Sequence, residues 1–202
     1  MTKPHHELFE AITKGNVEKV EHMILKGLKD NDWPCGNHDL TPLHIAVTHD
    51  QVQVANILLQ HGANVNFKVL EGTSLHLAAS NGFEEMAKLL IQKGAQIESK
   101  NKWGRTPLHR SVYPRNTIAN LLLWNGADID SKDNLGYTPL HFAIFHQRKG
   151  HALVLLRSGA SLNIRNQEGF TPIEFALKEN PFTIKCDAKL SNFKVISYNE
   201  ME

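Results

Sequence analysis

Residues 138–141 read Thr-Pro-Leu-His, and the same tetrapeptide stands at 41–44 and 106–109. Close variants occupy 73–76 (Thr-Ser-Leu-His) and 171–174 (Thr-Pro-Ile-Glu), so that successive copies begin 32, 33, 32 and 33 residues apart. A motif that returns at this period is typical of stacked units, each made of two short helices. The repeat therefore decides the fold before any local pattern is considered, and it leaves the chemistry open.

Each tetrapeptide has the features of a helix start. A threonine hydroxyl placed before an apolar run can accept a hydrogen bond from an unpaired backbone N–H of the first helical turn. In four of the five copies a proline follows the threonine, at a position where its missing N–H costs nothing and its backbone angle already suits a helix. We therefore expect a first helix to begin at every copy.

A turn and a second apolar helical face follow each first helix, as in Val54, Ile57, Leu58 and Leu59. Each second face ends in a Gly-Ala pair, where glycine is the expected left-handed stop of a helix. These pairs lie at 62–63, 94–95, 126–127 and 159–160. The polar stretch after each pair, such as 128–136, is expected to form an extended excursion back toward the next motif.

These residues resemble the ankyrin repeat family over about residues 5–181. The resemblance rests on Thr-Pro-Leu-His, on a following pair of small residues such as Ala78-Ala79, on Gly-Ala-Asp-Ile-Asp at 126–130, and on the period. It implies an all-α fold, an ankyrin repeat solenoid of stacked helix-turn-helix units with extended hairpin-like loops. A single helix pair cannot bury its apolar face alone, so stability comes from stacking and the two ends need caps.

On this interpretation the chain has four parts, and we number its repeats one to six. Residues 1–38 form an amino-terminal capping repeat, 39–169 four full repeats, 170–181 a partial last repeat, and 182–202 an apolar carboxyl-terminal tail. We expect the tail to act as a cap over the last repeat. The alternative is that its β-prone residues 193–198 add a strand to the sheet edge of a partner.

Composition excludes several function classes. The net charge is +1, with 22 basic and 21 acidic residues. This balance is not typical of proteins that bind nucleic acid or an anionic membrane surface. No apolar run is long enough to span a bilayer, and the amino terminus lacks a signal-peptide core. Cys35 and Cys186 do not make a disulfide framework, so we expect a cytoplasmic or nuclear monomer.

The histidines do not indicate a metal site. The chain has 12, and four of them are the last residue of the tetrapeptide: His44, His76, His109 and His141. The family resemblance implies that this position is structural, with the ring hydrogen-bonded between adjacent repeats. The remaining histidines lack the spacing and the acidic or cysteine partners of a zinc site. We expect no metal and no cofactor.

No catalytic motif is present either. The sequence has no Gly-rich phosphate loop, no nucleophile elbow and no kinase signature. We therefore expect the protein not to be an enzyme, and its function to lie in binding another protein.

The candidate binding residues are those that the repeat pattern leaves free. The resemblance implies a concave surface formed by loop tips and first helices, and at these positions aromatic and arginine side chains gather in repeats four to six. Such residues are enriched at interface hot spots. The alternative is that some of them simply pack between loops. The candidates are Trp103, Arg105, Tyr113, Arg115, Leu135, Tyr137, Phe145, His146, Arg148 and Phe170.

Repeat four departs from the pattern beside these residues. Its threonine lies 20 residues before the glycine of its Gly-Ala pair, against 21 in the other full repeats, and Pro114 disfavours helix at Tyr113. We expect the turn between its two helices to be rebuilt. The change either shapes a site or is a tolerated deletion.

We therefore expect a non-catalytic scaffold or adaptor that binds a protein through the concave face. One alternative is an inhibitor resembling the I-kappa-B proteins, which mask Rel-type transcription factors, although the Asp-Ser-Gly motif and acidic tail of those proteins are missing here. Another alternative is a substrate receptor of a ubiquitin ligase, for which the tail is short.

Overall fold

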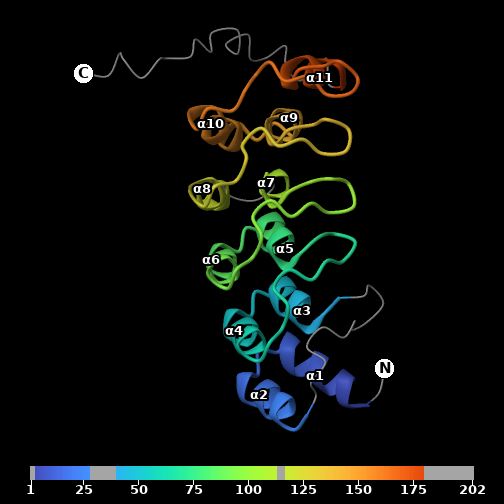
Figure 1. Ribbon diagram of the computed structural model, residues 1–202, viewed down its shortest axis with the longest axis vertical. Helices are drawn as coiled ribbons and strands as arrows, with labels where there is room; N and C mark the ends of the chain where they lie inside the picture. The colour runs from blue at the N-terminus through green and yellow to red at the C-terminus, as the bar shows by residue number, and fades with distance from the viewer. Residues whose placement is uncertain (1–2, 28–39, 113–116, 180–202) are drawn as a thin grey trace, which may run out of the picture.

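The computed structural model describes residues 3–27, 40–112 and 117–179. Their α-helices form two layers that run along the stack, and each of repeats one to five gives one helix to each layer (Figure 1). The layer of first helices consists of α1 (Lys3–Thr13), α3 (Pro42–Thr48), α5 (Ser74–Asn81), α7 (Pro107–Arg110), α9 (Pro139–Phe145) and α11 (Pro172–Glu179). The layer of second helices consists of α2 (Val17–Leu25), α4 (Val52–Gln60), α6 (Glu84–Gln92), α8 (Thr117–Trp124) and α10 (Lys149–Arg157).

Each helix packs mainly on its partner within the repeat and on its counterpart in the neighbouring repeats. Loops project from the side of the first helices, one above another (Figure 1). Within the described ranges no strand forms, and one isolated bridge joins Val69 to Gly72. The predicted all-α stack with hairpin-like loops is thereby confirmed.

The helix starts follow the predicted chemistry. Thr41 lies in extended backbone and its hydroxyl accepts a hydrogen bond from the backbone N–H of His44 (3.4 Å). At Thr73, Thr106 and Thr138 the same bond is joined by a second one, in which the histidine three residues later accepts from the threonine backbone N–H. In repeats two to five the first helix is therefore closed at its start by its own tetrapeptide.

The ends of the second helices also follow the predicted chemistry. The four glycines of the Gly-Ala pairs have φ angles of 91, 86, 87 and 95°. A side chain strains this left-handed region, which is why glycine is used there.

Leucines from both layers form one continuous core. The leucine of the tetrapeptide is buried in repeats two to five, and one leucine of the second helix in each of these repeats is buried in the same core. These residues are Leu43, Leu75, Leu108 and Leu140, with Leu58, Leu90, Leu122 and Leu155. Because every repeat shares this core with its neighbours, burial is continuous along the stack. None of the helices in the described ranges is long and apolar enough to cross a membrane.

Repeat four has the shortest first helix of the described part. α7 ends at Arg110 after 4 residues, whereas α3, α5, α9 and α11 have 7 or 8. Ser111 and Val112 are still buried behind it. The rest of the turn, residues 113–116, lies outside the described residues, and so do the candidates Tyr113 and Arg115.

Repeat six shows one uncovered face. α11 packs mainly on α9, and no second helix follows it within the described residues. Leu140, which the second helix of repeat five covers, is 0% exposed, whereas its counterpart Ile173 is only partly buried and Leu177 is 43% exposed. The predicted cap, residues 182–202, lies outside the described residues, so that prediction stays open.

Candidate interaction surface

An Asn or Asp side chain shapes each loop of repeats four to six. The backbone N–H of Asp133 donates to the carbonyl of Tyr137 (2.9 Å), and its Oδ1 accepts from the backbone N–H groups of Leu135 (2.9 Å) and Tyr137 (3.0 Å). Asn101 makes the same bonds with residues 103 and 105, and Asn166 with residue 170. All three side chains are buried. They hold the loop tips at Trp103, Leu135 and Glu168.

The loops are bonded to one another as well as to themselves. The backbone N–H of Asn134 donates to the carbonyl of Trp103 (2.9 Å), and that of Gln167 donates to the carbonyl of Leu135 (2.9 Å). The side-chain amides repeat the pattern, from Asn134 to the carbonyl of Lys102 (3.1 Å) and from Gln167 to that of Asn134 (2.8 Å). The three loop tips therefore form one ordered ridge.

The tetrapeptide histidines fasten this ridge to the helices. The Nε2 atoms of His76, His109 and His141 lie 2.9, 3.0 and 3.2 Å from the carbonyl oxygens of Arg105, Tyr137 and Phe170 in the next repeat. The predicted structural role of these rings is confirmed for those three. His44 has no partner for its Nε2 within hydrogen-bonding distance among the described residues.

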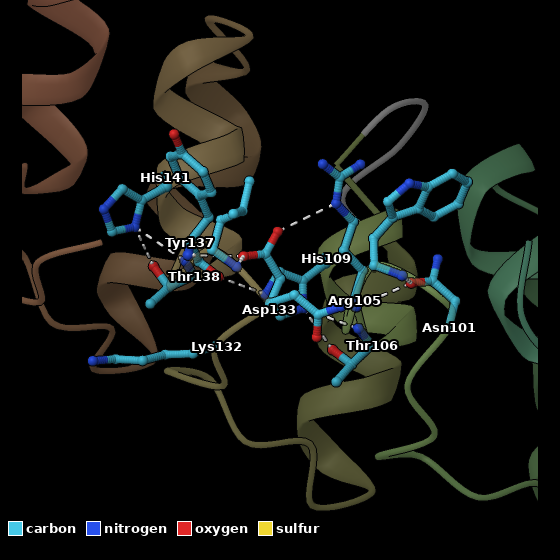
Figure 2. A network of polar contacts seen from close by, with 12 residues as sticks. Asn101, Arg105, Thr106, His109, Lys132, Asp133, Tyr137, Thr138 and His141 are labelled. Atoms are coloured by element: carbon cyan, nitrogen blue, oxygen red, sulfur yellow. Dashed lines mark hydrogen bonds and ion pairs between the residues drawn. The ribbon is translucent and has the colours of Figure 1, made fainter. Parts of the chain in front are cut away.

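These rings are neutral at physiological pH. Burial lowers the pKa of His76 and His109 to about 4, because a charged ring would lose its hydration. The Nδ1 of each ring accepts from a threonine backbone N–H, so the proton is on Nε2, which donates to the carbonyl. Figure 2 shows this arrangement twice, at Thr106 and His109 and at Thr138 and His141.

Arg105 is the centre of the candidate surface. Its Nε lies 3.4 Å from Oδ2 of Asp133, whose side chain is 2% exposed (Figure 2). The guanidinium carbon lies 4.4 Å from the ring centre of Phe142 and 5.9 Å from that of Trp103. Lys102 covers Trp103 at 4.2 Å. One buried carboxylate and two rings thus hold the arginine in place.

The aromatic side chains continue from Phe142 along α9. The ring of His146 stacks on Phe142 with centres 6.3 Å apart, and Phe145 meets His146 edge-on at 4.9 Å. Phe145 also contacts Phe175 of α11 at 5.2 Å. Arg148, at the start of α10, is exposed.

Tyr137 lies on the inner side of the cluster. It is 9% exposed and packs on Phe142 and Phe175, with ring centres 5.8 and 4.8 Å away. Its hydroxyl donates to Glu168 (3.2 Å), which also pairs with Lys178 (2.6 Å). Tyr137 therefore supports its neighbours from beneath, which is the loop-packing alternative considered above.

The structure brings most of the described candidates together. Trp103, Arg105, Phe145 and His146 are joined through Phe142, Leu135 stands on the ridge with 56% of its surface exposed, and Arg148 adjoins His146. Phe170 lies at the far end, where Lys178 covers its ring at 4.6 Å.

Sequence reasoning missed two kinds of residue. Phe142 directly follows His141, at a position that is apolar in most repeats, so it was indistinguishable from core. The loop-shaping Asn101, Asp133 and Asn166 lie 32 and 33 residues apart, and this spacing could have identified them. Among the described residues no group of three or more His, Cys, Asp or Glu side chains is arranged to hold a metal ion.

Comparison with known proteins agrees with this architecture. A family model described as ankyrin repeats (3 copies) matches residues 66–133 and 108–185, and a single ankyrin repeat model matches residues 38–68. The human protein called ankyrin repeat domain-containing protein 13C is 36% identical over 73 residues, which is 35% of this chain and 12% of that relative. This chain thus matches only a small part of the relative's length. Because the family models cover more than half of the chain, including the helix pairs of repeats two to five, the protein belongs to the ankyrin repeat family.

Proposed function

We propose that this protein is a non-catalytic adaptor that binds another protein through the ridge of loop tips and the adjoining first helices of repeats four to six. We call this area the loop–helix face, and it corresponds to the predicted concave surface. Ankyrin repeats are in general protein-interaction modules, and no catalytic family matches the chain. The identity of the partner and the use of this face are proposals.

The observation that carries the proposal is the placement of Trp103, Arg105, Leu135, Phe145 and His146. All are partly or largely exposed, and the repeat does not require their side-chain types, because the corresponding positions of repeats two and three hold mostly small or polar residues. Burying large aromatic and arginine side chains gives more binding free energy than burying other surface residues.

The ordered loops strengthen the argument. Backbone bonds join the tips of repeats four to six, and Asp133 holds Arg105, so these side chains lose little conformational freedom when a partner arrives. A preorganised surface binds more tightly than a mobile one with the same contacts.

Site-specific photocrosslinking tests the proposal. A photoreactive amino acid is placed at Leu135, on the ridge, or at Trp124, which is 92% exposed at the end of α8 in the other helix layer. Cells that make the protein are irradiated, and the crosslinked proteins are identified. A protein captured from position 135 and not from position 124 would support the proposal.

Purified components then give the quantitative test. The captured protein should bind the wild type and the Trp124→Ala control equally. It should bind a Trp103→Ala, Leu135→Ala variant at least about tenfold more weakly, since hot-spot truncations cost about 2 kcal/mol or more. Equal binding to all three proteins, with unchanged circular dichroism, would refute the assignment of this face.

A further inference from the structure

One edge of the Arg105 guanidinium is unused. Asp133 takes the Nε side and Phe142 lies against one face, but among the described residues the two terminal nitrogens have no hydrogen-bond partner. The side chain is 30% exposed, and Figure 2 shows these nitrogens directed away from Asp133. A planar pair of donors held in this way matches the two oxygens of a carboxylate.

The charges around this edge are predominantly positive. Lys102 and Arg148 are exposed on this surface. Burial lowers the pKa of His146, and the positive charges of Arg148 and Arg105 lower it further. Two acids of this surface already have partners, since Asp133 binds its own loop and Arg105, and Glu168 binds Lys178 and Tyr137. An incoming negative charge would therefore find uncompensated positive charge.

Apolar surface adjoins the same edge. Trp103 and Leu135 are consecutive tips of the ridge, joined by the bond from Asn134 to the Trp103 carbonyl. Phe145 and its neighbour His146 lie on the α9 side. A ligand that reaches Arg105 would thus also contact apolar side chains.

We propose that the loop–helix face recognises an acidic segment of its protein partner, in which a carboxylate binds the terminal nitrogens of Arg105 and an adjacent apolar side chain packs on Trp103 and Leu135. This inference rests on the proposed function and adds the chemical class of the partner. A segment of basic or purely apolar character would leave the arginine edge unpaired after desolvation, which costs binding free energy.

The test uses displayed random linear peptides selected on the 202-residue protein. Selection should enrich peptides that carry Asp or Glu next to an aromatic or aliphatic residue. One enriched peptide is then synthesised together with a version in which the acid is replaced by its amide, and both affinities are measured by fluorescence anisotropy. The amide version should bind at least about tenfold more weakly, because one member of a charged pair is lost.

Protein variants locate the contact. The Arg105→Gln variant should bind the acidic peptide more weakly by a similar factor. Its affinity for the amide peptide should be nearly the same as that of the wild type. Arg105→Lys should also weaken it, because an ammonium group cannot offer two parallel donors. Arg157→Gln removes an exposed arginine of α10 and serves as the matched control, with no expected effect. The amide peptide tests the contact even if an Arg105 variant folds poorly.

The outcomes separate the two proposals. Selection could instead enrich neutral or basic peptides that bind the Trp103→Ala, Leu135→Ala variant more weakly than the wild type. This result would refute the proposal of an acidic partner and would support the loop–helix face as the binding surface. Enriched peptides that are insensitive to every variant of this face would overturn both. Equal affinity of the acid and amide peptides would also overturn the carboxylate contact.

Discussion

Lowering the pH from about 7.5 to about 5 is predicted to destabilise the stack through its buried histidines. Burial lowers the pKa of His44, His76, His109 and His151 to about 4. In His76 and His109 a second proton would also have to go on Nδ1, where it would displace the bond from a threonine N–H. Among the described residues, the hydrogen bonding of the His151 ring is limited to a contact of 3.5 Å between its Nε2 and the hydroxyl of Ser111, and its Nδ1 has no hydrogen-bond partner.

The direction of this pH effect follows from the number of protons bound by the folded and unfolded states. In the unfolded chain a histidine has a pKa of about 6.5, so between about 4 and 6.5 the unfolded state holds more protons than the folded one. The free energy of unfolding therefore rises with pH through this window. The contribution is fully present above about pH 6.5 and is lost as the pH falls toward about 4.

The size of the effect is large on the scale of protein stability. At about pH 5 each of these histidines is protonated in most unfolded molecules and neutral in most folded ones, which costs about 2 kcal/mol per histidine. Four such groups amount to several kcal/mol, against a total of about 5–15 kcal/mol for a typical folded protein. The stack should approach its unfolding threshold near the lower pH.

Urea denaturation followed by far-ultraviolet circular dichroism at several pH values measures the effect. A His109→Gln variant should be less stable at neutral pH and should lose about 2 kcal/mol of the pH dependence. His22→Gln, at an exposed position of α2, is the control and should keep the wild-type dependence. The same free energy of unfolding at both ends of the pH range, or an unchanged slope in His109→Gln, would refute the reasoning.

Three further changes have defined outcomes. Asp133→Ala should lower the free energy of unfolding by about 1–3 kcal/mol, because two backbone N–H groups lose their acceptor. Asp133→Asn should lower it less, since Asn shapes the neighbouring loops. Urea denaturation of the two variants measures the difference. Gly104→Ala should destabilise more than Gly94→Ala in the same assay. Both glycines have positive φ, but a Cβ at Gly104 would come within 2.7 Å of the Asn134 backbone nitrogen, whereas nothing lies within 4 Å at Gly94. A chain ending at residue 181 should show faster amide exchange in α11, because we propose that the tail covers its exposed face, and unchanged exchange would contradict the cap.

Local chemistry was predictable from the sequence because it acts within one turn of chain. Thr106 and Pro107 determine a helix start, and Gly126 determines a helix end, through bonds to residues three or four positions away. The period then orders these pieces into a stack. The confirmed features of the fold are therefore those in which sequence neighbours are also spatial neighbours.

The candidate site was less predictable because its contacts join residues about one repeat apart in the chain. Arg105 meets Phe142 and Asp133 only after two repeats have stacked, and the ring of Tyr137 turns inward at a position where Arg105 and Phe170 stand in other loops. Side-chain direction at such positions depends on the neighbouring repeat. Residue type alone identified the region, and the geometry separated exposed from supporting side chains.

The short helix α7 has a consequence for how the molecule comes apart. In a linear stack each unit is held only by its neighbours, so the unit with the least helix is a natural boundary between cooperative blocks. α7 has 4 residues and packs more on α5 than on α9, so that repeat four meets repeat five largely through the bonds that join the 101–105 loop to the 133–137 loop, and the boundary falls there. A ligand that spans repeats four to six would bridge this boundary. The two blocks, which would open separately in the free protein, would then open together in the complex.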